Sequence, residues 1–156
     1  VQMARRIKPG AEVLFFSMDA ESPVMLKHLE DGGRGAYLQD GAVWLNEGTL
    51  DLACPMIYTA DDKQFAGDLA AWQAAAPGKP IAPGMGIYLH KPGASDSQLV
   101  LCDAGRTPGY AIFSYAAMYE SVDKFQDKSE AKVRERAERL GAMKQALSTR
   151  AGKPRP

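Results

Sequence analysis

The sequence predicts an α/β fold built on a parallel β-sheet. Four short segments are almost continuously hydrophobic, which is typical of strands that are covered on both faces. Helical patterns separate these segments, and this alternation favours parallel strands joined by right-handed crossovers. The 156 residues are enough for one domain with a substantial core.

The four predicted strands are rich in β-branched and aromatic residues. They span residues 12–17, 50–58, 80–86 and 110–115. They do not alternate between apolar and polar residues, as a strand with one face in water would. Aromatic and hydroxyl-bearing residues collect where the chain leaves each strand.

Five helices are predicted in the remaining sequence. They span residues 22–29, 40–47, 61–75, 95–104 and 129–147. The third places Phe65, Leu69 and Trp72 on one face, the spacing of an amphipathic helix. Ser95 precedes the fourth as a candidate N-cap.

The last predicted helix begins after Ser129 and combines an apolar stripe with many charges. The expected stripe is Val133, Ala137, Leu140 and Leu147. The charged residues expected to form a solvated face are Lys132, Arg134, Glu135, Arg136, Glu138 and Arg139. Residues 148–156 have no apolar periodicity, so we expect a disordered tail after a folded domain of residues 1–147.

Composition and charge argue against several classes of partner. Nineteen Lys and Arg balance 19 Asp and Glu, so no net field attracts nucleic acid or an anionic membrane. No apolar run approaches the roughly 18 residues that a membrane span needs. The two cysteines, Cys54 and Cys102, lie in apolar surroundings and form no CxxC motif. We therefore expect two buried free thiols and no zinc site.

Two architectures fit this rhythm of strands and helices: a doubly wound open sheet and part of a closed (β/α)₈ barrel. A nucleotide-binding open sheet would carry a glycine-rich turn between a strand and a helix N-terminus. Residues 84–86 are not followed by a helical pattern, and the glycines of residues 32–35 do not follow a strand. Aromatic and hydroxyl groups at the strand ends fit the carboxyl face of a barrel, where barrel active sites lie.

Three segments match a known pattern in order and spacing. Residues 39–59 read QDGAVWLNEGTLDLACPMIYT, residues 83–88 read PGMGIY and residues 109–115 read GYAIFSY. They resemble three successive late strands of the family-10-like glycosyl hydrolases, which are bacterial (β/α)₈-barrel domains. The resemblance implies that the predicted strands are strands five to eight, and that the N-terminal half-barrel is a missing partner. It also implies a polysaccharide or bacterial cell-wall glycan as substrate, and a periplasmic, secreted or lipoprotein location.

The length and the first residue agree with a partial barrel. A complete (β/α)₈ barrel typically needs about 250 residues, and this sequence starts at Val1. Half a barrel would expose two unpaired strand edges and an apolar inner face. We therefore expect the isolated chain to dimerise, aggregate or fold poorly.

The candidate site residues follow the strand ends. Glycoside hydrolysis usually uses two carboxylates, one as acid and one as base or nucleophile. Asp19 ends the first predicted strand and is the candidate catalytic residue. Tyrosines suit a sugar because the ring covers apolar C–H faces while the hydroxyl bonds to sugar hydroxyls. The candidate substrate-binding residues are Tyr58, Thr59, Asp61, Tyr88, His90, Ser114 and Tyr115.

Other acids near the strand ends have alternative roles. Asp61 is also placed to cap the helix that follows it, and Asp62 and Glu120 lie a little beyond their strands. In the resembled family the catalytic acids lie largely on earlier strands. The resemblance thus implies that this chain supplies a sugar-binding wall and lacks most of the acid–base pair.

The expected function is that of a glycoside hydrolase-like domain with an incomplete active site. No cofactor is implied, and His28 and His90 are not at metal-ligand spacing with each other or with a cysteine. One alternative is a non-catalytic carbohydrate-binding module, which paired carboxylates on strands one to four of a parent chain would exclude. The other is an unrelated open-sheet α/β enzyme.

Overall fold

The computed structural model describes residues 14–17, 41–120 and 126–151. The elements in chain order are β1 (Leu14–Ser17), α3 (Gly41–Asn46), β2 (Leu52–Ile57), α4 (Asp62–Ala75), β3 (Gly84–Gly86), the 3₁₀ turn η2 (Ile87–Leu89), α5 (Asp96–Ala104), β4 (Ala111–Phe113), the 3₁₀ turn η3 (Tyr115–Ala117) and α6 (Glu130–Ser148). The predicted alternation of strands and helices is confirmed over these residues. Asp19, His28 and the predicted helix at 22–29 lie outside the described residues.

The four described strands form one parallel sheet in the order β1-β2-β3-β4. Leu14 pairs with Leu52, Met56 with Gly84, and Gly86 with Phe113. Spatial order therefore equals chain order. Among the described strands there is no reversal of the kind at which doubly wound sheets bind nucleotides. The predicted parallel α/β architecture is confirmed at this level, as a small open sheet.

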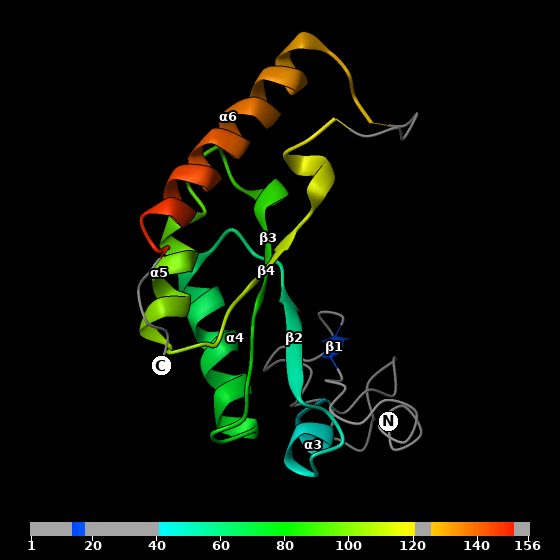
Figure 1. Ribbon diagram of the computed structural model, residues 1–156, viewed down its shortest axis with the longest axis vertical. Helices are drawn as coiled ribbons and strands as arrows, with labels where there is room; N and C mark the ends of the chain where they lie inside the picture. The colour runs from blue at the N-terminus through cyan, green and yellow to red at the C-terminus, as the bar shows by residue number, and fades with distance from the viewer. Residues whose placement is uncertain (1–13, 18–40, 121–125, 152–156) are drawn as a thin grey trace.

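The helices that connect and follow these strands lie in one layer. Figure 1 shows α4, α5 and α6 together on one side of β2, β3 and β4. Right-handed crossovers that advance in one direction along a sheet place their helices on the same face. The core between the two layers includes Leu45, Ala53, Ile57, Phe65, Leu69, Trp72, Ile81, Met85, Leu99 and Cys102. None of the described helices covers the other face of the sheet.

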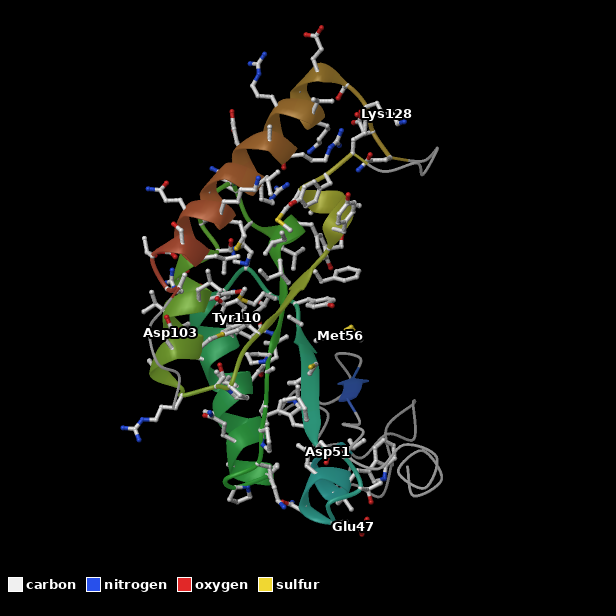
Figure 2. All side chains as sticks on the ribbon, viewed as in Figure 1. Glu47, Asp51, Met56, Asp103, Tyr110 and Lys128 are labelled. Carbon is white, nitrogen blue, oxygen red and sulfur yellow. The ribbon has the colours of Figure 1, made fainter. Side chains whose placement is uncertain are left out.

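Side chains of the sheet alternate between these two faces, as they must in a strand. Ile57 of β2 pairs with Met85 of β3, and both are buried in the core beneath the helices. Met56 is one residue away and only half-buried. Figure 2 shows it on the side of β2 away from α4 and α5. Met85 thus marks the face covered by the helices, and Met56 marks the opposite face.

Helix α6 packs differently from the sequence prediction. Its fully buried residues are Arg136, Arg139 and Met143, whereas Val133 of the expected apolar stripe is 45% exposed. The expectation that Arg136 and Arg139 face solvent is therefore wrong. A long arginine side chain can cover apolar surface while its guanidinium reaches polar groups at the edge of the core. Both arginines do so here, by donating to backbone carbonyls.

The end of α6 is fixed by ion pairs to α5. Arg150 Nη1 lies 2.8 Å from Asp96 Oδ1, and Arg150 Nε lies 3.0 Å from Asp103 Oδ2. The first residues of the expected tail thus continue or flank α6, while residues 152–156 lie outside the described residues. Within the described segments, none of the helices has the length and apolarity that crossing a bilayer requires. Cys54 and Cys102 are both buried, as predicted, and no disulfide joins them.

Candidate functional site

Three aromatic rings meet at the carboxyl ends of three neighbouring strands. Tyr58 follows β2, Tyr88 lies in η2 directly after β3, and Phe113 ends β4. The Tyr58 and Phe113 rings are stacked, with centroids 5.1 Å apart and planes inclined by 15°. Tyr88 meets both rings edge-on, with centroid distances of 6.2 Å to Tyr58 and 6.0 Å to Phe113. We call Tyr58, Tyr88 and Phe113 the aromatic cluster.

Two glycines of β3 make the stacked arrangement possible. Strand β3 lies between β2 and β4, so the Tyr58 ring must cross it to reach Phe113. A Cβ atom on Gly86 would lie 3.1 Å from Tyr58 Cβ, and one on Gly84 would lie 3.3 Å from Tyr58 Cε1. The Tyr58 side chain therefore rests on the bare backbone of β3. Any larger residue at these two positions would push it away.

The outer members of the aromatic cluster are open to solvent. Tyr88 is 47% exposed and Phe113 is 48% exposed, whereas Tyr58 is only partly exposed. Two half-exposed rings supported by a third, more deeply placed ring form an apolar surface, and two of the three rings carry a hydroxyl group. Such a surface can pack against a ligand that presents both C–H groups and hydroxyls.

The environment of Tyr58 also affects its ionisation. Burial raises the pKa of the Tyr58 hydroxyl, and the neighbouring Tyr88 raises that pKa further. The hydroxyl therefore remains a neutral donor and acceptor at physiological pH, as required for hydrogen bonding to a neutral ligand.

The raised pKa predicts a loss of stability in alkali. The folded protein holds the Tyr58 proton more tightly than the unfolded chain does, so the free energy of unfolding should fall as the pH rises through the ordinary tyrosine value of about 10. Tyr58→Phe should make this fall shallower. Urea unfolding of both proteins at pH 8 and above pH 10 measures the effect. Equal pH dependence in the two proteins would contradict the assigned environment.

Tyr115 lies outside the aromatic cluster. It is 63% exposed in η3, and its ring stacks on Tyr119 with a centroid distance of 4.5 Å. Ser114 connects Phe113 to this turn through a cis peptide bond between Phe113 and Ser114. The predicted pair Ser114 and Tyr115 therefore follows β4 as expected, and Tyr115 forms a second, separate aromatic pair.

Thr59 and Asp61 belong to the start of α4. Asp61 is the N-cap, and its Oδ1 accepts hydrogen bonds from the backbone N–H groups of Lys63 at 2.8 Å and Gln64 at 3.0 Å. The Thr59 hydroxyl accepts from the Asp61 backbone N–H at 3.1 Å. The capping role that the sequence offered for Asp61 is thus present. These polar groups organise the loop beside the aromatic cluster.

His90 lies in the loop directly after η2, as predicted, and is buried there. It is 8% exposed, and its backbone carbonyl accepts a hydrogen bond from Arg139 of α6 at 3.0 Å. Its Nε2 atom has no hydrogen-bond partner among the described residues. The structure therefore joins His90 to the helix layer and leaves it outside the aromatic cluster.

The described acids beyond the strand ends do not form a facing pair. Asp61 is engaged as a helix cap, and Glu120 lies 3.5 Å from Lys128 in an exposed ion pair. In the described segments there is also no group of three or more His, Cys, Asp or Glu residues arranged to hold a metal ion.

Surface cavities lined by described residues lie elsewhere. One of about 370 Å³ is lined by Gln73, Lys79, Pro80 and Arg106 among others, and one of about 280 Å³ lies between Asp96 and Gln145. The first is at the amino ends of the strands, opposite the aromatic cluster. In parallel α/β folds the functional site lies at the carboxyl ends, so the aromatic cluster remains the candidate.

Sequence reasoning missed Phe113, Tyr119 and the role of the β3 glycines. Phe113 stands at the end of the last predicted strand but was not named as a site residue, and its pairing with Gly86 places it on the same face as Tyr58. Strand parity was the available signal, because residues two apart share a face. Residues 84–86 were interpreted as part of a strand and weighed as a phosphate loop, although glycine in a strand also marks the close approach of another group.

No match was found with a protein-family model, a curated protein or a solved structure.

Proposed function

We propose that the aromatic cluster binds carbohydrate, in a glycoside hydrolase-like domain that acts on a polysaccharide or cell-wall glycan. The observation that carries this proposal is the convergence of Tyr58, Tyr88 and Phe113 at the carboxyl ends of three adjacent parallel strands. Aromatic faces cover the apolar C–H surfaces of a sugar, and neutral tyrosine hydroxyls complement its hydroxyl groups. The zero net charge of the chain fits a neutral ligand better than an anionic one.

We further propose that these four strands are consecutive strands of a (β/α)₈ barrel. Parallel strands in sequential order, with α4 to α6 on one face, support this account. In a barrel the other face of the sheet lines the interior. The Met56 side chain would then point into the barrel beneath the aromatic cluster, and Gly84 and Gly86 would lie on the same inner face.

The barrel proposal predicts how the chain behaves alone in solution. An apolar inner face and the outer edge of β4 should drive association, so the chain should elute as a dimer or larger species in size-exclusion chromatography with light scattering. Far-UV circular dichroism should accompany the measurement. A stable, well-folded monomer would argue against an unclosed barrel.

Catalysis would need carboxylates from outside the described residues. Retaining and inverting glycosidases both use an acid and a second carboxylate across the scissile bond. Asp19 remains the catalytic candidate of this chain, and barrel strands other than these four would supply its partner. The alternative is a non-catalytic module, which the capping of Asp61 and the ion pairing of Glu120 favour as far as the described acids go.

Binding of defined oligosaccharides tests the proposed function. Oligomers of N-acetylglucosamine and of glucose are titrated into the full chain by calorimetry. Phe113→Ala and Tyr88→Ala should each weaken binding by about tenfold or more, as expected for a buried aromatic contact. Val100→Ala is the matched control, because Val100 is an exposed apolar residue of α5 that lies outside the cluster.

The outcomes separate the candidates. Equal affinities of the three variants, or the absence of binding to both series of oligomers, would contradict the carbohydrate proposal. Release of reducing ends that Asp19→Asn abolishes would favour the hydrolase over the binding module. Binding without hydrolysis would favour the module.

A further inference from the structure

Buried polar side chains bind the loops that carry three of the candidate site residues, Tyr58, Tyr88 and Tyr115. Gln98 of α5 donates from Nε2 to the carbonyl of Thr59 at 2.8 Å. Arg139 of α6 donates from Nη2 to the carbonyl of His90 at 3.0 Å and from Nη1 to that of Ala117 at 2.9 Å. Each bond crosses from the helix layer to a loop that leaves a strand.

The accepting carbonyls have a common relation to the site. They lie one residue after Tyr58, two residues after Tyr88 and two residues after Tyr115. A hydrogen bond to a carbonyl so close in the chain restricts the backbone that presents the ring. The three bonds thus act on the three segments from which tyrosines extend.

We propose that Gln98 and Arg139 are positioning residues, through which α5 and α6 set the placement of Tyr58, Tyr88 and Tyr115. What those tyrosines bind rests on the proposed function, whereas their placement does not. Gln98 and Arg139 touch no ligand in this proposal and act only through the loop backbone.

Burial makes a purely packing role a poor explanation for these side chains. Gln98 is fully buried and Arg139 is 5% exposed. A hydrophobic residue of similar volume would usually fill such a position at least as stably, because a buried polar group must first lose its hydration. The carbonyls that they reach explain Gln98 Nε2 and the two Nη atoms of Arg139. Gln98 Oε1 and Arg139 Nε have no hydrogen-bond partner among the described residues.

The charge of Arg139 is balanced on its own helix. Glu135 Oε1 lies 2.6 Å from Arg139 Nη2, one turn earlier in α6. Hydrogen bonds from Lys132 and from Arg139 lower the pKa of the Glu135 carboxyl, so Glu135 remains ionised at physiological pH. The ion pair fixes the guanidinium plane, which then directs two N–H groups at two different loops.

The chain offers a matched control for each positioning residue. Gln73 of α4 also donates from Nε2 to a loop carbonyl, that of Gly105 at 2.7 Å, but at the amino ends of the strands. Arg136 is one turn before Arg139, is 7% exposed and donates to the carbonyl of Asp127. Neither control residue donates one of these hydrogen bonds to a segment that carries Tyr58, Tyr88 or Tyr115.

The test compares Gln98→Leu with Gln73→Leu, and Arg139→Lys with Arg136→Lys, in the full chain. The readout is the NMR ring signals of the tyrosines without ligand, assigned through Tyr→Phe variants. Gln98→Leu should shift the Tyr58 signals, and Arg139→Lys those of Tyr88 and Tyr115. The control variants should leave these signals unshifted, although their melting temperatures should fall by about as much as those of the test variants. Affinity for N-acetylglucosamine oligomers should fall by about tenfold in the two test variants only.

Each result decides one question. Unshifted ring signals in Gln98→Leu and Arg139→Lys, or equal shifts in the controls, would overturn the positioning roles. If the unmodified chain binds no oligosaccharide, the proposed function fails while the ring signals still decide the positioning. If Arg139→Lys does not fold, Gln98→Leu and its control decide the proposal through Tyr58 alone.

Discussion

Replacing Gly86 with alanine should destabilise the protein by about 1–3 kcal/mol, the usual cost of forcing an extra methyl group into a packed site. The new Cβ would lie 3.1 Å from Tyr58 Cβ, 3.2 Å from Tyr58 Cγ and 3.3 Å from Leu89 Cδ1. Because the first two contacts are to the base of the Tyr58 side chain, the ring must move as a whole. Its stack on Phe113 should be lost, and ligand binding at the aromatic cluster with it. Urea unfolding and calorimetric titration measure the two effects.

Gly67→Ala is the control for this substitution. Gly67 lies inside α4, and apart from its chain neighbours and the backbone of that helix no heavy atom lies within 4 Å of a Cβ placed there. Alanine should stabilise this exposed helical position by about 0.5–1 kcal/mol. If both substitutions stabilise the protein, Tyr58 does not rest on the backbone of β3, and the account of the aromatic cluster is wrong.

Met85→Ala should be the most costly substitution in the sheet. Met85 is fully buried between β3 and the helices, and truncating a buried methionine costs about 2–5 kcal/mol through lost contacts and the cavity left behind. Met56→Ala, one residue out of phase on the neighbouring strand, should cost less than about 1 kcal/mol because Met56 is only half-buried. Chemical denaturation of the two variants gives the comparison directly.

The ratio of these two costs reports which face of the sheet is covered. A large difference agrees with a single helix layer over Ile57 and Met85. A cost at Met56 equal to that at Met85 would mean that the second face is also packed in solution, and the open inner face would have to be abandoned. Repeating the Met56→Ala measurement at several protein concentrations separates self-association from packing within one chain.

The sequence predicted the elements well because the apolar pattern that defines them is local. The stripe Phe65, Leu69 and Trp72 is buried as expected, and the four strand positions agree with the observed sheet. The strand order was not available from these patterns. It depends on which strands pair across the sheet, and local periodicity contains no such information.

The errors in the sequence prediction occur where side-chain reach overrides periodicity. Arg136 and Arg139 read as a solvated face, yet their guanidinium groups bond to carbonyls from distant loops. Ser95 occupies the predicted N-cap of α5 but makes no capping hydrogen bond with its side chain. The arginine outcome depends on neighbours far away in the chain, which only the folded structure supplies. Ser95 has a helical backbone conformation (φ −76°, ψ −3°), whereas a capping residue usually has an extended one.

The candidate site was predicted in part. Tyr58 and Tyr88 were placed together because both follow strands that end at one edge of the sheet, and the structure brings their rings into contact. Phe113 was missed because a phenylalanine in an apolar strand resembles any other core residue until its facing partner, Gly86, is known.

The polar attachment of α6 has a consequence for local unfolding. Two of its three fully buried residues are arginines, and its end is held by Arg150 through ion pairs to exposed acids of α5. Detaching this helix returns guanidinium groups to water and uncovers only the part of the core that Met143, Ala146 and Leu147 contact, so the opening should cost less free energy than global unfolding. Amide protons of α6 should exchange with solvent ahead of those in β2 and α4. Because Arg139 leaves with the helix, each opening also breaks its hydrogen bonds to the loops after β3 and β4. These loops should return to their bound conformation each time α6 packs against the core again.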